Sequence, residues 1–312
     1  MDDSRSFSGK SNGNRLLYHA VAFIVVVIWG STFVFTKLLL LDGLTAAQIF
    51  TLRFLIAYAL LLGWSLLSRK HRWLCANWRD EGVMLALGVT GGSLYFLAEN
   101  NALNYTTATN TSLIVCSCPL VASVLIGMFY KVERMNRVQF IGALMAVAGV
   151  AAVVLNGHFV LHLSPVGDAL ALLANLCWAI YSLLMVQANG RYDTAFITRK
   201  VFFYGLVTMI PFYLAVPEEA RLFLNISDSH PSSATILNLL FLGCVASMGC
   251  FLAWTWCMKK LGAVVATNYV YLNPVATIVF AWWMLSEDIT PYFLLGSALI
   301  LIGMYLADRK RS

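Results

Sequence analysis

Ten apolar runs occupy almost the whole chain and constrain its fold more than any other feature. A membrane-spanning helix needs roughly 20 mostly apolar residues, and the runs are close to that length. Apolar residues make up 60% of the chain and charged residues 12%, against ~25% charged in soluble domains. We therefore predict an all-α integral membrane protein with ten transmembrane helices, at 18–41, 46–67, 82–102, 107–130, 138–156, 166–187, 201–216, 236–258, 263–285 and 292–307.

The basic residues support this span count. Of 21 lysines and arginines, 18 fall in the tails and connections on one side of the predicted membrane, including Arg199 and Lys200 between spans 6 and 7. Only Arg221 falls on the other side, and Lys37 and Arg53 lie within spans. Cytoplasmic loops carry the excess of lysine and arginine. We therefore expect a multi-pass protein of the inner (cytoplasmic) membrane with both termini in the cytoplasm.

The sequence shows no pattern of catalysis, metal binding or cofactor binding. It has no G-x-x-x-x-G-K-[S/T] stretch, no H-E-x-x-H and no C-x-x-C. His158 and His162 are spaced like metal ligands on a helix, but no third ligand accompanies them. We therefore expect that the protein is not an enzyme and that it has no cofactor, no metal and no nucleic-acid partner. The expected partners are a small-molecule substrate, the lipid bilayer and protons as a candidate coupling ion.

The second half of the chain repeats the first. Matching residues include Trp29 and Trp178, Arg53 and Arg199, Pro119 and Pro274, and Gly142 and Gly296. Each half has five spans, an odd number, so the second half must enter the membrane from the opposite side. Inverted repeats are typical of transporters, with the substrate site near the midplane. We predict a first repeat at 18–156 and a second at 166–307, between cytoplasmic tails at 1–17 and 308–312.

Several motifs resemble the EamA-type module of the drug/metabolite transporter superfamily. They are WGSTF (29–33), TLRF (51–54), NALNYTTATNTSLIVCSCP (101–119) and LGAVVATNYVYLNP (261–274). The sixth span departs from the pattern, with WAIYS where a second WGSTF is expected. The resemblance implies a ten-helix carrier of the bacterial inner membrane that usually exports amino acids, related metabolites or drugs.

We therefore expect a secondary transporter that exports small metabolites, either amino acids or amphipathic compounds and drugs, by alternating access of its two halves. An importer or exchanger of small solutes is the alternative within this class. A passive channel or scaffold, and a membrane-embedded enzyme acting on lipid, are the alternatives from other classes. An enzyme would need convergent catalytic groups, which the sequence does not show.

Three charges inside the first half form a predicted cluster. Lys37, Arg53 and Glu99 each lie within about 10 Å of the same membrane boundary at 1.5 Å per residue. Charged residues at membrane depth usually face the bundle interior or one another. Arg53 has a counterpart in the repeat, which favours an architectural role. Lys37 and Glu99 have none, which favours substrate or proton handling, against snorkelling for Lys37 and a structural ion pair for Glu99.

Aromatic and polar side chains near mid-membrane form a predicted substrate site. Trp29 and Trp178 lie too deep for the interfacial aromatic belts. Residues three or four apart share a helix face, which groups Tyr95 with Glu99 and Asn175 with Trp178. An aromatic cavity with a few polar anchors suits amphipathic solutes or cations. The predicted substrate-binding residues are Trp29, Tyr95, Glu99, Asn175, Trp178, Trp254 and Tyr271, and helix packing is the alternative for each.

Pro119 and Pro274 are predicted helix breaks within spans 4 and 9. Proline removes a backbone hydrogen bond and clashes with the preceding turn. Matched breaks favour hinges or cavity-lining carbonyls, and fixed kinks are the alternative. Glycines seven apart in spans 5 and 10, such as Gly142 and Gly149, allow close packing within the bundle or, alternatively, at a dimer face.

Overall fold

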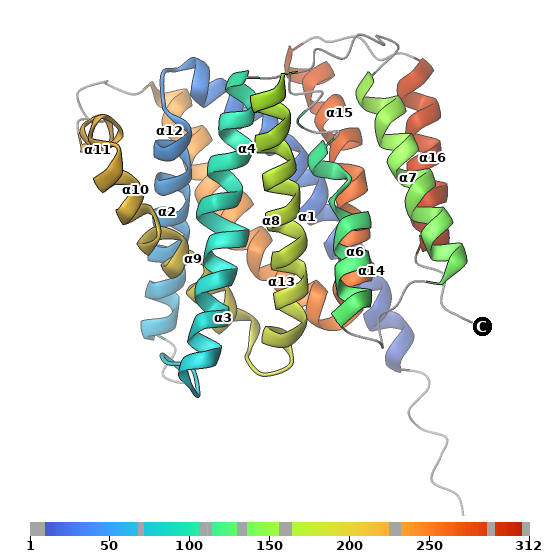
Figure 1. Cartoon of the computed structure of the whole chain (residues 1–312), viewed down its shortest axis with the longest axis horizontal. Coiled ribbons are helices and arrows are strands. Elements are labelled where there is room, and N and C mark those ends of the chain that lie inside the picture. The colour runs from blue at the N-terminus through green and yellow to red at the C-terminus, as the bar shows by residue number, and fades with distance from the viewer. Residues whose placement is uncertain are drawn as a thin grey trace, which may run out of the picture.

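The computed structural model is a helical bundle (Figure 1). It describes residues 10–67, 72–105, 111, 114–129, 136–155, 164–224, 232–285 and 291–307. Several sequence predictions fall outside these residues: those on His158 and His162, on the first nine and last five residues, and on the basic connection that contains Lys131 and Arg134.

The first half of the chain supplies five crossings. Its helices are α1 (Lys10–Leu41), α2 (Ala46–Leu67), α3 (Trp78–Gly88), α4 (Leu94–Tyr105), α6 (Cys118–Phe129) and α7 (Arg137–Leu155). A π-helical segment, η1 (Val89–Ser93), joins α3 to α4 within the third crossing.

The second half supplies five more crossings. Its helices are α8 (Pro165–Asn189), α9 (Thr194–Val207), α10 (Met209–Ala215), α11 (Pro217–Leu224), α12 (Ser233–Leu240), α13 (Cys250–Leu261), α14 (Ala263–Asn268), α15 (Asn273–Leu285) and α16 (Pro291–Ala307). The eighth crossing contains the π-helical segment η4 (Phe241–Gly249), and the ninth contains the 3-10 turn η5 (Tyr269–Leu272).

These elements confirm the predicted fold class. Within the described residues, seven helices are long and apolar enough to cross a membrane. Three shorter apolar helices, at Ile114–Phe129, Arg137–Ala152 and Leu294–Ala307, bring the crossings to ten. α1 and α8 begin at opposite ends of the bundle (Figure 1), so the two halves run in opposite directions. We call the end where α1 begins, α3 begins and α8 turns into α9 the basic end, and the other the opposite end.

The seventh crossing starts earlier than the sequence predicts. Asp193 caps α9, because its side chain accepts a hydrogen bond from the backbone N–H of Phe196. Arg199 and Lys200 therefore lie in the second turn of a membrane helix and are buried, which corrects their predicted place in a loop. The pairing of Lys200 with a carboxylate, described below, allows this burial.

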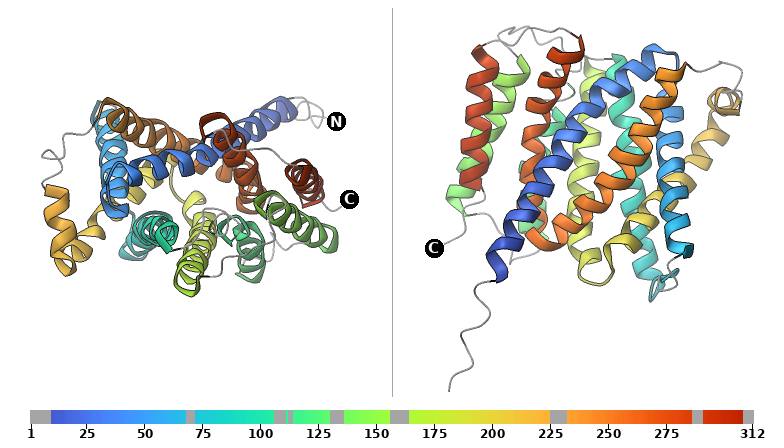
Figure 2. Two further views of the ribbon diagram at one scale, coloured as in Figure 1. Left: turned by 90° about the horizontal axis from the view of Figure 1, so that it is seen from above. Right: turned by 180° about the vertical axis from the view of Figure 1, so that it is seen from behind.

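α7 and α16, the last helices of the two halves, pack together along one edge of the bundle (Figures 1 and 2). A Cβ atom on Gly142 would lie 2.6 Å from the carbonyl oxygen of Gly303, and one on Gly303 would lie 2.6 Å from that of Gly142. Any larger residue would push the two backbones apart. The structure therefore places these glycines in packing within the bundle.

Candidate substrate cavity

A cavity between the two halves holds most of the charged and aromatic residues singled out above. The space in it that water-sized molecules can occupy is about 40 Å³. Its walls come from α1, α2, α4, the segment 114–116 before α6, α8, α13, η5 and the start of α15. Its lining residues are Trp29, Thr32, Phe33, Arg53, Tyr95, Phe96, Glu99, Val115, Trp178, Phe251, Val270 and Asn273.

Arg53 and Glu99 bring opposite charges to this cavity without pairing. Glu99 is 7% exposed, and its Oε1 accepts a hydrogen bond of 2.9 Å from the Tyr95 hydroxyl. Arg53 is 2% exposed, and its Nε donates to Ser247 Oγ at 2.9 Å. Within the described residues, no nitrogen of Arg53 approaches an oxygen of Glu99 within 4 Å. Neutral partners therefore hold each charge in place.

Phe96 gives Arg53 a further contact. The guanidinium carbon of Arg53 lies 4.5 Å from the centre of the Phe96 ring. A cation over an aromatic face is attracted by the ring quadrupole. This contact orients the guanidinium and leaves N–H donors available to a carboxylate, since guanidinium has five.

Tryptophans pack together beside the cavity. The Trp29 ring lies 5.4 Å from that of Trp178 and 5.0 Å from that of Trp254, measured between centroids. Trp29 Nε1 donates to the carbonyl oxygen of Ala246, in η4, at 2.9 Å. Trp29 and Trp178 line the cavity, whereas Trp254 lies behind them with no exposed surface. The cavity wall is therefore rigid and apolar, with Trp29 fixed across the two halves.

Three predicted substrate-binding residues lie elsewhere. Asn175 donates from Nδ2 to the Ile114 carbonyl oxygen at 2.6 Å and to Ser117 Oγ at 2.8 Å. Trp254 and Tyr271 are fully buried and do not line the cavity. These placements favour the packing alternative for all three side chains.

Lys37 does not join the predicted charged cluster. It is exposed on the surface of α1 and does not line the cavity. Its position suits the snorkelling alternative, in which the ammonium group reaches toward the membrane surface. Of the three predicted charges, Arg53 and Glu99 line the cavity and Lys37 does not.

Pro119 and Pro274 each follow an interruption of their helix. Pro119 is the second residue of α6, after a turn at Ser117 whose N–H donates to the Ile114 carbonyl oxygen at 3.3 Å. Pro274 is the second residue of α15, directly after η5. Neither proline lines the cavity, but its neighbour Asn273 does. The breaks therefore shape the cavity through adjacent residues.

Sequence reasoning missed seven lining residues. Two of them, Thr32 and Phe33, belong to the WGSTF motif, and Asn273 immediately precedes Pro274, so both motifs carried a usable signal. Phe96 neighbours Tyr95 in α4. The others are Val115, Phe251 and Val270, apolar residues that look like any others in a membrane span.

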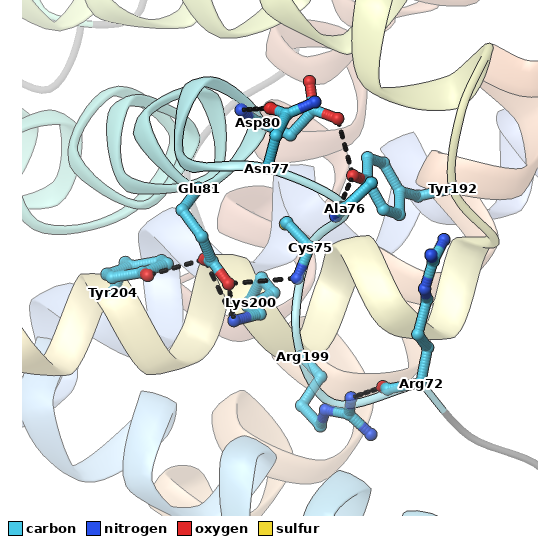
Figure 3. Close-up of polar contacts among 10 residues, drawn as sticks. All are labelled: Arg72, Cys75, Ala76, Asn77, Asp80, Glu81, Tyr192, Arg199, Lys200 and Tyr204. Carbon is cyan, nitrogen blue, oxygen red and sulfur yellow. Dashed lines mark hydrogen bonds and ion pairs between the residues drawn. The ribbon is translucent and has the colours of Figure 1, made fainter.

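The basic end is closed by a network of paired charges (Figure 3). Lys200 Nζ lies 2.7 Å from Glu81 Oε1, and the Tyr204 hydroxyl donates to Glu81 Oε2 at 2.7 Å. Arg191 Nη1 lies 2.6 Å from Asp80 Oδ1. Asp80 and Glu81 belong to the first turn of α3, in the first half, and their partners belong to the second half. The network therefore ties the two halves together at this end.

Tyr192 completes the network in the turn between α8 and α9. Its hydroxyl donates to Asp80 Oδ2 at 2.6 Å and accepts from the N–H of Ala76 at 2.9 Å. Burial and the hydrogen bond to Asp80 raise the pKa of Tyr192 to about 12. The hydroxyl therefore keeps its proton, and its hydrogen bond, throughout the neutral range.

The fold and the cavity are those of a membrane transporter. The fold has ten apolar crossings in two opposed halves, and charged and aromatic side chains line the central cavity. The family profile described as the EamA-like transporter family matches residues 16–155 and again 165–307. The chain belongs to this family, a branch of the drug/metabolite transporter superfamily. It is therefore a multi-pass membrane transporter and not an enzyme.

Relatives of similar length support this assignment. An uncharacterized transporter of Archaeoglobus fulgidus is 28% identical over 94% of this chain and 98% of its own. A probable amino-acid metabolite efflux pump of Escherichia coli is 25% identical over 92% of this chain and 93% of its own. A probable terminal-alkyne amino-acid exporter of Streptantibioticus cattleyicolor is 26% identical over 74% of each chain. A protein of known crystal structure, 17% identical, superposes with a TM-score of 0.74 over 93% of this chain and 96% of the other, which shows the shared fold.

Proposed function

We propose that this protein is a secondary transporter that exports small zwitterionic or amphipathic solutes, with amino acids as the first candidates. The observation that carries the proposal is the unpaired Arg53 and Glu99 in one aromatic cavity. A zwitterion would place its carboxylate near Arg53 and its ammonium group near Glu99, with its side chain against Trp29 or Trp178. Two relatives named for amino-acid or amino-acid metabolite export support this substrate class.

Burial makes this recognition selective. Both side chains have given up most of their contact with water, and the only hydrogen bonds shown for them are to neutral partners. A charged ligand group that reaches either one gains a charge-assisted hydrogen bond in a poorly hydrated site. A neutral solute of the same shape would leave both charges unmatched, at a cost. Zwitterions should therefore bind better than neutral analogues.

The basic end is proposed to face the cytoplasm. It carries Arg15, Arg72, Arg79, Arg137, Arg191, Arg199, Lys200, Lys259 and Lys260 among the described residues, as the positive-inside rule requires. This orientation places both termini in the cytoplasm and the protein in the cytoplasmic membrane. A cysteine at position 191, in a cysteine-free background, should then be protected from impermeant reagents in intact cells, whereas one at 218 should be labelled.

The two halves are proposed to alternate between states open to either side. In the structure, the network of Asp80, Glu81 and their partners joins the halves at the basic end. These contacts would have to break when solute enters from the cytoplasm. They would have to form again before solute is released on the other side. Protons are the candidate coupling ion, and Glu99 is the acidic side chain in the cavity that could carry one.

Counterflow in proteoliposomes tests the proposal. Vesicles preloaded with an unlabelled amino acid should accumulate the same amino acid in labelled form. The matching neutral analogue, with an acetylated amine and an amidated carboxyl group, should not compete. Arg53→Gln should abolish this preference for zwitterions. An importer would also show saturable counterflow, but in cells it would move solute inward. An exchanger would move one solute inward in cells for each one that it moves outward. A passive channel would give flux without saturation or counterflow, and would overturn the proposal.

A further inference from the structure

A second hollow lies at the basic end, on the outside of the bundle. It offers water-sized molecules about 780 Å³ between α2, α3, α9 and the segment from Trp73 to Asn77. We call it the basic-end groove. Its polar wall includes Arg199, Lys200 and the carboxylate of Glu81. Tyr58, Trp73, Leu74 and Phe203 contribute apolar surface. Figure 3 shows Glu81 and Arg199 together with Arg72, which lies beside the groove.

The two cations of the groove differ in their partners. Lys200 is neutralised by Glu81, with its Nζ at 2.7 and 3.0 Å from the two carboxylate oxygens. Arg199 has no carboxylate oxygen within 4 Å among the described residues, and Asp193 acts on it only from farther away. Arg199 is nevertheless only 3% exposed. Its charge is therefore buried without a counter-ion.

Arg199 is held in place by neutral groups. Its Nη2 donates to the carbonyl oxygen of Arg72, and its guanidinium carbon lies 4.3 Å from the centre of the Trp73 ring. A guanidinium group has five N–H donors, so the hydrogen bond to the Arg72 carbonyl oxygen leaves most of its capacity for a ligand in the groove. Burying an unpaired charge is costly, and an anion at this point would offset that cost. Phosphate suits the planar fork of arginine particularly well.

The surroundings indicate the kind of anion. Leu74 is 72% exposed and Phe203 is 39% exposed, so apolar surface continues outward from the charged wall. Trp73 and Trp78 lie at the end of the helical crossings, where tryptophan marks the membrane–water interface. Arg72 and Arg79 add positive charge close by. A polar phosphate beside an apolar outlet at an interface matches a phospholipid, and basic residues at such a place attract anionic ones.

We propose that the basic-end groove binds the phosphate headgroup of an anionic phospholipid such as phosphatidylglycerol. Arg199 contacts the phosphate, and Tyr58 and Phe203 contact the first part of the acyl chains. The proposal needs only that the chain spans a membrane. It does not depend on which solute is transported or in which direction, so lipid binding and counterflow can succeed or fail separately.

Native mass spectrometry of the protein released from nanodiscs tests this site. The nanodiscs contain equal amounts of phosphatidylglycerol and phosphatidylcholine. The wild-type protein should retain phosphatidylglycerol preferentially, and Arg199→Gln should lower its retention about ten-fold, as expected for the loss of one charge-assisted contact. Lys260→Gln removes an exposed cation at the same end and should leave retention unchanged.

A second pair of variants covers the case in which Arg199→Gln does not fold. Leu74→Glu places a negative charge at the mouth of the groove, and Leu16→Glu places one on α1 at the same end; these leucines are 72% and 73% exposed. Only Leu74→Glu should reduce retention of phosphatidylglycerol. Equal retention of the two lipids by wild type, equal effects of the paired variants, or complete displacement by millimolar inorganic phosphate would each overturn the proposal.

Discussion

The central cavity and the basic end both bury charged side chains, but they treat those charges differently. At the basic end, Glu81 and Lys200 are paired at 2.7 Å across the two halves. In the cavity, Arg53 and Glu99 stay apart, each with a neutral partner. The repeat relates Arg53 to Arg199, and both arginines are buried beside neutral partners, one in the central cavity and one at the basic end. The Lys200–Glu81 pair thus joins the two halves at the basic end, whereas the unpaired Arg53 and Glu99 leave the central cavity able to bind a charged solute.

The largest expected effect tests the aromatic packing beside the cavity. Trp254→Ala should lower the free energy of unfolding by about 3–5 kcal/mol, because it empties a fully buried site beside Trp29 and Trp178. Trp178→Ala, at the cavity wall, should mainly change substrate preference and apparent affinity. Melting temperature in detergent and counterflow with small and bulky solutes measure the two outcomes. Unchanged preference in Trp178→Ala would contradict its assignment to the cavity.

The next largest effect concerns the paired charges. Glu81→Gln should lower the free energy of unfolding by about 3 kcal/mol, because it leaves the ammonium group of Lys200 buried without its partner. The double variant with Lys200→Met should recover much of the loss. Melting temperatures of the single and double variants in one detergent check this, and a single variant as stable as wild type would refute the closing role of the pair.

Glu99→Gln should have the reverse signature. Among the described residues, no cationic nitrogen lies within 4 Å of the Glu99 carboxylate, so the melting temperature should change far less than in Glu81→Gln. Counterflow of zwitterionic solutes should fall about 10- to 100-fold, the equivalent of about 1.4–2.8 kcal/mol for a lost charged contact. Glu218→Gln, an exposed acid at the opposite end, is the control. Wild-type transport in Glu99→Gln would remove this carboxylate from the proposed site.

The smallest effect is expected at Arg191. Its side chain is 54% exposed, so its pairing with Asp80 is screened by solvent. Arg191→Gln should cost less than about 1 kcal/mol of stability. Asp80 also accepts a hydrogen bond from Tyr192, which remains in this variant. A fall in melting temperature as large as that of Glu81→Gln would show that solvent exposure does not make the Arg191–Asp80 pair weaker than the Lys200–Glu81 pair.

The sequence predicts the bundle and part of the cavity because both rest on local rules. Span length, charge placement and the internal repeat give the ten crossings in two opposed halves. Depth within a span and spacing along a helix bring Trp29, Tyr95, Glu99 and Trp178 to one cavity. Arg53 joins them because a charge at that depth is costly unless it faces the interior.

The remaining placements depend on how each helix is rotated against its neighbours. Asn175 and Trp178 are three residues apart, yet Trp178 faces the cavity and Asn175 contacts the broken segment at Ile114 and Ser117. Lys37 lies on the outer surface of α1 although its depth resembles that of Arg53. The π-helical segments η1 and η4 also change the helical register, and no motif identified in the sequence predicts them.

The glycine contact between α7 and α16 also has a consequence for how the chain is made. Gly142 and Gly303 touch backbone to backbone, although about half of the chain separates them in sequence. During synthesis α7 enters the membrane long before α16 has been made. Its small-residue face therefore stays uncovered until the final helix is inserted. A nascent chain that stops before α16 would expose that face to lipid and to other proteins. The two halves are therefore joined along this edge only after the last helix has been inserted.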